Sequence, residues 1–334
     1  MDLALTDEQS AVREAFAALF AKEAPTTRVR EVEAEGIDRN LWATVHEMGA
    51  FDLGLPEAYG GGGGGLVELV LIAEEAGRRI APIPLAEPVA AARLCAQVGA
   101  RDLIEGIVEG ATIVSMATAP GPLGSQVLVD GAVADVVITL EDDRLMANRR
   151  PIVRPVPNLG GLPAARWVAT DAGTVLMTGE PALAAYDRAC DDVRVLRSAA
   201  LVGLAAEAIE IGAAYARERL AFGTPIGTFQ AVAHPLADAV TANDGAQLLV
   251  RKAAWALEEE LPDAPGLAAM AFVFTSEVAY AAAQHSLHIH GGYGFMEEYD
   301  IQLYYRRAKA WSVTFGDPAH ELGTLADRLF GSKA

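Results

Sequence analysis

The sequence predicts an α+β protein of three consecutive parts: an N-terminal helical domain, a small middle β-domain and a C-terminal antiparallel helical bundle. Apolar residues recur at helical spacing through the first hundred residues. Short runs rich in Val, Ile and Thr, bounded by Gly, Asp and Pro, then follow at strand-like intervals. Long helical patterns with short connections complete the chain, as in a bundle. We place the domains at 1–110, 111–190 and 191–334.

The N-terminal domain begins with a predicted helix over residues 6–22, in which Thr6 and Gln9 have the spacing of a capping box. Asp38 is expected to cap a second helix. The apolar positions of that helix are Leu41, Trp42 and Val45. Six consecutive glycines, Gly60 to Gly65, predict a loop. Two further helices are expected after this loop, at 66–78 and 86–98.

The middle domain is predicted from five short runs, at 111–117, 125–131, 133–141, 165–171 and 173–179. In the third run, Ala134, Val136, Ile138 and Leu140 are expected on one face. The C-terminal pattern turns helical from about Asp192, and its first helix is apolar nearly all round. The later helices are expected at 229–261, 266–290, 299–313 and 318–330.

The chain has 334 residues, of which 52% are hydrophobic, and a net charge of −19. Such a field repels nucleic acid phosphates. An anionic ligand would therefore need a local basic cluster, of which the sequence has few: Arg78-Arg79, Arg149-Arg150, and Arg306-Arg307 with Lys309. Cys95 and Cys190 have no disulfide framework or metal-ligand spacing. No signal peptide or membrane anchor is recognised, so we expect a cytoplasmic protein without nucleic acid or membrane partners.

Four segments carry a more specific signal, because they occur together and in order. They are LPEAYGG (55–61), AEEAGRRIAPIPL (73–85), RERLAFGTPIGTFQAVAHPLADA (217–239) and HIHGGYGFMEEY (288–299). With the helical–β–helical order, they resemble the acyl-CoA dehydrogenase family over the whole chain. The resemblance implies an FAD-dependent oxidoreductase that oxidises an acyl-CoA thioester between its α and β carbons. It also implies an electron-transfer flavoprotein as the acceptor.

The resemblance also implies which residues reach across a subunit boundary to FAD: Arg219, Phe222, Gln230, Gly291, Gly292 and Gly294. Arginine suits a diphosphate because its planar fork makes two charge-assisted bonds, and bare glycine backbone can approach phosphate closely. His288 stands where the family often has glutamine, and we include it as a cofactor-contact candidate. The structural alternatives are a helix C-cap at Gly291, a turn at Gly294, a solvated helix end at Arg219 and a cap at Gln230.

The catalytic carboxylate of the family is missing. The resemblance places it before a glycine, where this chain has Phe315, or near the start of the first long C-terminal helix, where it has Arg194. Weak substitutes are Asp317, read mainly as a helix cap, and Glu298, read mainly as a structural partner of Arg306 or Arg307. Asp191 and Asp192 are interpreted as favouring the dipole at a helix entrance.

The β-domain also departs from the family pattern. MATAPGPLGS (116–125) only weakly matches the segment that covers the flavin ring, with Ala119 in place of its glutamate. These losses lead to one hypothesis: the chain is the subunit without the base in an α2β2 heteromeric acyl-CoA dehydrogenase, of the kind that degrades steroid side chains or other bulky acyl groups. A paralogous subunit would supply the base. The alternatives are a homomeric enzyme with a relocated carboxylate and a flavin-free acyl-CoA-binding scaffold.

Overall fold

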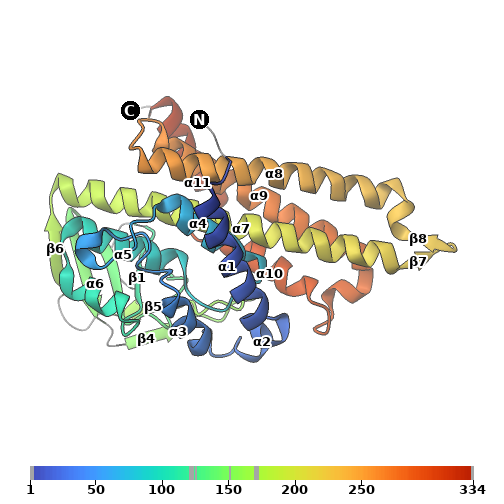
Figure 1. Ribbon diagram of the computed structural model, residues 1–334, viewed down its shortest axis with the longest axis horizontal. Coiled ribbons are helices and arrows are strands. Elements are labelled where there is room, and N and C mark those ends of the chain that lie inside the picture. The colour runs from blue at the N-terminus through green and yellow to red at the C-terminus, as the bar shows by residue number, and fades with distance from the viewer. Residues whose placement is uncertain (1–3, 120–123, 125, 150–151, 169–172, 332–334) are drawn as a thin grey trace.

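The computed structural model describes residues 4–119, 124, 126–149, 152–168 and 173–331. It shows the three predicted parts in the predicted order (Figure 1). The N-terminal helices are α1 (Asp7–Glu23), α2 (Thr26–Glu31), α3 (Arg39–Glu47), α4 (Leu66–Arg78), α5 (Ala86–Val98) and α6 (Arg101–Val108), with a short 3₁₀ turn η1 (Glu57–Tyr59).

Local sequence signals locate the N-terminal helices. Thr6 and Gln9 form the predicted capping box of α1. The Asp38 carboxylate accepts hydrogen bonds from the backbone of Asn40 and Leu41 and so starts α3. The glycine loop ends where the Glu68 side chain accepts from the Gly65 N–H, and α4 begins there. Capping chemistry therefore sets these helix starts where the sequence predicts them.

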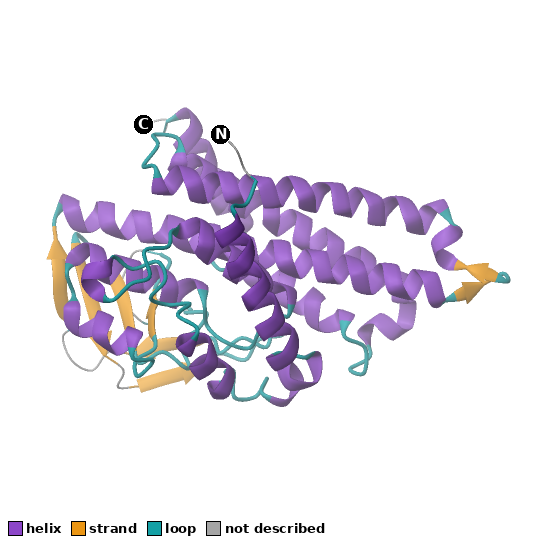
Figure 2. Ribbon diagram, viewed as in Figure 1, coloured by secondary structure: helices purple, strands orange, loops and turns teal. Residues whose placement is uncertain are grey.

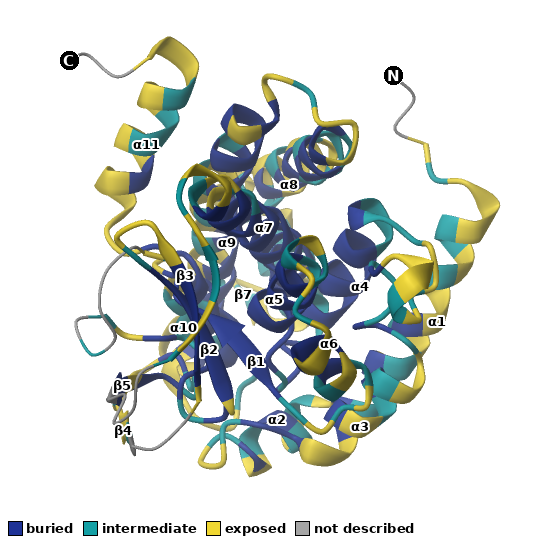
Figure 3. Ribbon diagram, turned by 90° about the vertical axis from the view of Figure 1, so that its left-hand side faces the viewer, coloured by how far each residue is buried: buried dark blue, intermediate teal, exposed yellow. Residues whose placement is uncertain are grey.

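The middle region holds the four-stranded sheet, in the order β1–β2–β3–β6. Its strands are β1 (Val114–Met116), β2 (Val136–Glu141), β3 (Arg144–Arg149) and β6 (Thr174–Thr178), with β4 (Ile152–Pro155) and β5 (Ala165–Val168) paired separately. Strand β1 is parallel to β2, and the other pairs are antiparallel. Figure 3 shows β1 and β2 as buried strands beside α5 and α6.

The structure differs from the predicted strands at one predicted run and at two strands, β3 and β4, that were not predicted. Residues 126–131 form no strand, and Leu128 makes only an isolated bridge to Ala165. Within β2, Val136, Ile138 and Leu140 share one face as predicted, while Val137 and Thr139 are buried as fully on the opposite face. A central strand covered on both sides does not alternate between apolar and polar positions.

The C-terminal bundle occupies the other half of the molecule (Figure 2). Its helices are α7 (Glu180–Glu218), α8 (Gln230–Glu258), α9 (Ala264–His290), α10 (Ile301–Trp311) and α11 (Pro318–Phe330). Strands β7 (Leu220–Ala221) and β8 (Thr224–Pro225) form a hairpin between α7 and α8, followed by the 3₁₀ turn η2 (Ile226–Thr228). A second 3₁₀ turn, η3 (Gly291–Phe295), follows α9 directly.

Helix α7 is the axis of the fold, because it packs on α4, α5, α8, α9 and α10. Its contact with α4 is made at two glycines: a Cβ at Gly203 would lie 1.8 Å from the Glu74 carbonyl oxygen, and one at Gly77 would lie 2.0 Å from that of Ala200. Each helix thus has a glycine where the other backbone touches it. Substitution at either position would push α4 away from α7.

Two segments of the described chain, Glu180–Glu218 and Ala264–Phe295, are long and apolar enough to cross a membrane by length and composition. In the fold, 61% and 67% of their most apolar windows are buried by the neighbouring helices. Their apolar character is therefore accounted for by their place at the centre of the bundle.

Helix α7 begins at Glu180, twelve residues before the predicted start at Asp192, with Pro181 in its first turn. Asp191 and Asp192 therefore lie inside a helix and are buried, rather than at its entrance. The dipole role predicted for them is wrong. Their charges are balanced instead by arginines of α7 itself and of other elements.

Candidate functional site

The far end of the bundle brings together two segments that lie far apart in the sequence. Arg219 follows the last residue of α7, and its N–H donates to the Tyr215 carbonyl oxygen at 2.9 Å. Its guanidinium carbon lies 5.9 Å from the ring centroid of Tyr293, in the glycine turn η3. The predicted arginine and the predicted turn therefore form one surface, beside the β7–β8 hairpin on the right of Figure 1.

The three glycines of this turn have different physical roles. Gly291 has φ +60° and its N–H donates to the His288 carbonyl oxygen, so it caps α9. A Cβ at Gly291 or Gly292 would meet nothing within 4 Å, and both residues are exposed. At Gly294 a Cβ would lie 2.5 Å from the Leu287 carbonyl oxygen. Packing thus explains Gly294, whereas Gly292 leaves bare backbone on the surface that packing does not require.

The hairpin beside the turn exposes Phe222, the aromatic residue of the RxxFG segment. Its φ is +54° and its exposed fraction is 98%. A non-glycine residue in the left-handed region costs about 1 kcal/mol or more. The ring meets Phe229 edge to face, with centroids 6.3 Å apart. A strained backbone that holds an apolar ring in solvent is typical of a residue that acts in a complex.

The two remaining predicted cofactor contacts lie close in sequence to this surface. Gln230 is the first residue of α8 and is exposed. His288 is exposed on the last turn of α9. Other exposed apolar residues of the hairpin and the turn extend the surface: Leu220, Tyr293, Phe295 and Met296. We call Arg219, Phe222, Gln230, His288 and Gly291–Gly294 the clasp.

Arg219 is exposed and has no carboxylate partner among the described residues. Arg78 and Arg79, by contrast, both pair with Glu207. Lys309 and Arg149 also lack a carboxylate partner within the described part of the chain, although Lys309 lies over the Tyr280 ring. Arg150 lies outside the described residues. Arg219 is therefore an uncompensated cation next to the glycine turn.

The remaining basic cluster is used inside the fold. Arg306 pairs with Glu33 through nitrogen–oxygen distances of 2.6 and 3.2 Å. Arg307 donates to the carbonyl oxygens of Gly160 and Gly161, and burial lowers its pKa to about 10. Glu298 is exposed and pairs with neither arginine, so the structural role predicted for it is wrong. Arg307 is held by the loop around Gly160, and not by Glu298 as predicted.

The two positions at which the resemblance places the base lie against each other. Arg194 is buried on α7, and Phe315 is buried in the loop between α10 and α11. The Arg194 guanidinium carbon lies 4.3 Å from the centroid of the Phe315 ring. At this separation the contact is a cation–π interaction. The place of a carboxylate is thus filled by a cation and an aromatic ring.

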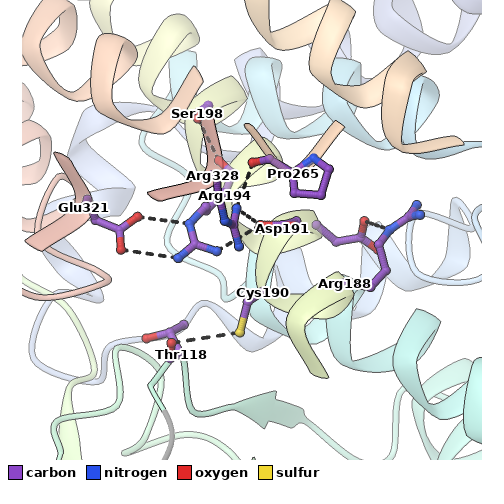
Figure 4. Close-up of polar contacts among 10 residues, drawn as sticks. Thr118, Arg188, Cys190, Asp191, Arg194, Ser198, Pro265, Glu321 and Arg328 are labelled. Atoms are coloured by element: carbon purple, nitrogen blue, oxygen red, sulfur yellow. Dashed lines mark hydrogen bonds and ion pairs between the residues drawn. The ribbon is translucent and has the colours of Figure 1, made fainter. Parts of the chain in front are cut away.

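Arg194 is also held by a network of ion pairs (Figure 4). Its Nε and Nη2 donate to the two Glu321 carboxylate oxygens at 3.0 and 3.3 Å, and its Nη1 donates to Asp191 at 2.9 Å. Arg328 reaches the same Asp191 oxygen at 2.5 Å. Two cations and two anions therefore balance. We call Asp191, Arg194, Glu321 and Arg328 the charge cluster.

Glu321 is the buried carboxylate that the sequence analysis did not identify. It lies in the first turn of α11, six residues after Phe315. Both of its oxygens are engaged by Arg194. A carboxylate bound in this bidentate way has roughly two of its four lone-pair sites taken by the guanidinium. Glu321 is thus held as the counter-ion of Arg194.

Two other candidate carboxylates, Asp192 and Asp317, also have structural partners. Asp192 accepts from Arg93 at 2.8 Å and from Arg188 at 3.1 Å. Asp317 is exposed, and its carboxylate accepts from the Ala319 N–H at 2.8 Å as the N-cap of α11. The capping role predicted for Asp317 is confirmed. Each of these side chains is accounted for by folding.

The segment that resembles the flavin-covering strand lies directly on the bundle. The Thr118 hydroxyl donates to the Thr314 carbonyl oxygen at 3.1 Å, beside Phe315. The Tyr186 hydroxyl, on α7, donates to the Ala117 carbonyl oxygen at 2.9 Å. Residues 120–123 and 125 lie outside the described residues. Direct hydrogen bonds thus join the two layers between which a ring system would have to fit.

This geometry fits half of a dinucleotide site. The clasp offers a free guanidinium, open glycine backbone and an exposed aromatic ring, which suit a diphosphate and an adenine. At the opposite end of such a ligand, where a carboxylate would face a flat ring system, this chain has Arg194 against Phe315 instead. The fold and the clasp together define a flavin-dependent dehydrogenase subunit.

Comparison with known proteins identifies that class. Residues 6–101 match the acyl-CoA dehydrogenase N-terminal domain, and residues 185–330 match the acyl-CoA dehydrogenase C-terminal domain. The chain belongs to the acyl-CoA dehydrogenase family, whose cofactor is FAD. It is 31% identical to acyl-CoA dehydrogenase IpdE2 of Mycolicibacterium smegmatis over 98% of this chain and 100% of that protein. IpdE2 of Mycobacterium tuberculosis is 29% identical, over 98% of each chain.

Two solved structures share the fold over the whole chain. The Tcur3481-Tcur3483 steroid ACAD, solved as a variant, has a TM-score of 0.85 at 28% identity and covers 97% of this chain and 98% of its own. The ChsE4-ChsE5 complex from Mycobacterium tuberculosis has a TM-score of 0.89 at 24% identity and covers 100% of both chains. At that identity the second match shows the fold alone.

Proposed function

We propose that this chain is the subunit without the base in a heteromeric α2β2 acyl-CoA dehydrogenase, and that a paralogous subunit provides the base and the flavin-ring pocket. The observation that carries the proposal is an asymmetry within one chain. The clasp is exposed and uncompensated, whereas the base position is filled by Arg194, Phe315 and Glu321. A homomer of this chain would repeat an incomplete site.

The similar proteins support the proposal. Two of the matched structures carry paired names, ChsE4-ChsE5 and Tcur3481-Tcur3483, and the second is described as a steroid ACAD. We therefore infer a bulky, steroid-like acyl-CoA as the substrate class and a catabolic role in the cytoplasm. An electron-transfer flavoprotein is the proposed acceptor, in keeping with the Etf-linked caffeyl-CoA reductase subunit among the relatives.

FAD, when bound, would supply a hydride acceptor for the β hydrogen of the thioester, and the partner subunit would supply the carboxylate that takes its α proton. The residues of this chain would act at the other end of the cofactor. Arg219 would hold the diphosphate through two directed hydrogen bonds. The exposed backbone at Gly292 would approach the same group, and Phe222 would offer its ring to the adenine.

The test is co-purification of this chain with a paralogous acyl-CoA dehydrogenase encoded beside it. We expect a 2:2 complex by native mass spectrometry, a flavin absorption spectrum and acyl-CoA oxidation that neither chain shows alone. Flavin should be bound at one FAD per heterodimer. An active, flavin-containing homomer of this chain would overturn the proposal and favour a relocated base.

A matched pair of variants tests the clasp itself. Arg219→Ala in the complex should lower the FAD content, because the diphosphate loses its guanidinium. Arg217→Ala removes a neighbouring exposed arginine from the last turn of α7 and should leave the FAD content unchanged. A complex that stays colourless with both chains intact would favour the flavin-free scaffold instead.

A further inference from the structure

A closed circuit of aromatic contacts lies beneath the clasp. Tyr215 on α7 stacks on His290, the last residue of α9, with centroids 4.1 Å apart and an interplanar angle of 23°. His290 meets Tyr299 edge to face at 6.1 Å. Tyr299 stacks on Tyr293 at 5.4 Å, and Tyr293 lies under Arg219. Since Arg219 bonds back to Tyr215 through its main chain, the circuit is complete.

This circuit connects the end of α7 with the turn after α9, and both must contact the same ligand. Arg219 ends α7, and the bare backbone at Gly292 follows α9, so their relative position depends on how the two helix ends are held together. His290 is itself fixed, because its Nδ1 lies 2.7 Å from the Ser286 carbonyl oxygen and its ring is buried. The circuit is thus anchored in the bundle at one side and ends at Arg219 on the other.

Tyr293 is the member of the circuit that touches Arg219. It is 43% exposed, so the fold has little need of it as a core residue. Arg219 has no carboxylate partner among the described residues that would otherwise fix its direction. An exposed arginine has large rotamer freedom, and ordering it on binding costs affinity. A ring beneath the guanidinium reduces that freedom before the ligand arrives.

We propose that Tyr293 is a positioning residue, which acts through Arg219 to hold the guanidinium in its diphosphate-binding direction. The proposal rests on the proposed function, because it assumes that Arg219 meets the FAD diphosphate. It predicts that this chain, and not its partner, controls how tightly the adenosine diphosphate half of FAD is held. The hydroxyl of Tyr293 has no part in it.

The experiment measures FAD affinity of the heteromeric complex, by fluorescence titration of the apo-complex, in four variants. Tyr293→Leu keeps the bulk and removes the π face, and it should weaken FAD binding roughly 3- to 30-fold, the range of one cation–π contact. Tyr293→Phe keeps the face and should bind as the wild type. Arg219→Ala and the double variant Arg219→Ala/Tyr293→Leu complete a double-mutant cycle.

The double-mutant cycle distinguishes a positioning role of Tyr293 from a general effect on the fold. If Tyr293 acts through Arg219, the double variant binds FAD as weakly as Arg219→Ala and no weaker. Losses that multiply, or a Tyr293→Phe variant as weak as Tyr293→Leu, would overturn the inference. Arg219→Ala with unchanged affinity would instead overturn the proposed function. Thermal unfolding of each variant, expected to match the wild type, verifies that the fold is intact.

Discussion

At the scale of single residues, the charge cluster shows how a base position can be converted to a structural one. Arg194 alone would be a buried charge, which is costly. It is stabilised by Glu321, Asp191 and the ring of Phe315. Because Asp191 is shared with Arg328, the four charges form one unit and each depends on the others. The ion pairs of this unit thus attach α11 to α7.

We therefore expect the members of the charge cluster to be strongly non-additive. Glu321→Ala leaves Arg194 buried with one shared partner and should destabilise the chain by about 3–5 kcal/mol. Replacement of both residues, Arg194→Met with Glu321→Met, should cost much less, because Asp191 keeps Arg328. Urea unfolding midpoints of the single and double variants give the comparison.

The same double variant distinguishes structure from catalysis. In the assembled complex its turnover should stay within about twofold of the wild type. A fall of several orders of magnitude would identify Glu321 as a relocated base and contradict the proposed function. Equal destabilisation by Glu321→Ala and by the double variant would contradict the expected coupling between Arg194 and Glu321.

His46 provides a second prediction at this scale, on pH. Its ring stacks on Phe51 with centroids 4.1 Å apart and meets the edge of Trp42, and its Nε2 is buried without a partner. Desolvation lowers the pKa of His46 to about 4, below the ordinary 6.5. The unfolded chain therefore binds the proton more readily between these values. Stability from His46 is full above pH 6.5 and is lost as the pH falls toward 4.

The variant His46→Phe removes this titration and keeps the ring. Its melting temperature should fall less between pH 7 and pH 5 than that of the wild type, which takes up about one more proton on unfolding in this window. Other titrating groups are common to both proteins and cancel in the difference. Parallel pH profiles would show that His46 is not the group responsible.

At the scale of elements, the sequence predicted the helices whose ends depend on local chemistry. The capping box at Thr6 and the caps at Asp38 and Asp317 are all confirmed. The start of α7 was missed although Gly179 and Pro181 mark it, because two adjacent aspartates were read as a helix entrance. Tertiary contacts from Arg93 and Arg328, with Arg188 and Arg194 of the same helix, balance these carboxylates inside it.

Strands β3 and β4 were missed for a related reason. Strand β3 has arginine at both ends and a buried Asn148, so its apolar run is limited to the three residues Leu145, Met146 and Ala147. The Asn148 side chain donates to the Thr139 hydroxyl of β2 at 2.9 Å. A polar pair satisfied across two strands stabilises this pairing, and no pattern within either strand shows it. Cross-strand partners are visible only in the folded chain.

Helix α11 allows a test of the capping assignment. Asp317→Ala removes the acceptor for the Ala319 N–H and should cost about 1 kcal/mol of stability. Asp317→Asn keeps a capping oxygen and should be nearly neutral. Turnover of the complex should be unchanged in both, since the side chain is exposed and has this structural partner. A large loss of turnover in the Asn variant, measured at saturating acyl-CoA, would instead assign Asp317 as a base.

At the scale of the whole molecule, the sequence predicted the three-part order and the family, because both depend on segments recognisable one at a time. It also placed Arg219 and the glycine turn in one site, which the fold brings together. It could not show that Arg194 lies on Phe315 or that Glu321 pairs with Arg194, since Arg194 is far from both residues in the chain. The clasp and the charge cluster lie on different parts of the bundle.

We expect the partner subunit to contact this chain at the clasp, which lies apart from the charge cluster at the β7–β8 end of the bundle. Phe222 is 98% exposed on strained backbone there, whereas Phe330, 85% exposed, ends α11, which lies away from the β7–β8 hairpin (Figure 1). Phe222→Gly should release the strain and leave the isolated chain as stable as the wild type or slightly more stable. It should weaken the heteromeric complex at least about tenfold, as loss of an aromatic anchor does.

Phe330→Gly is the matched control, because it removes an equally exposed ring outside the clasp. Its complex should have the wild-type dissociation constant in analytical ultracentrifugation. Equal weakening by both variants would indicate that the partner contacts both the clasp and α11. Weakening by Phe330→Gly alone would place the interface at α11 and not at the clasp. Only selective loss in Phe222→Gly, with FAD released in step with the partner, agrees with a cofactor held between two different chains.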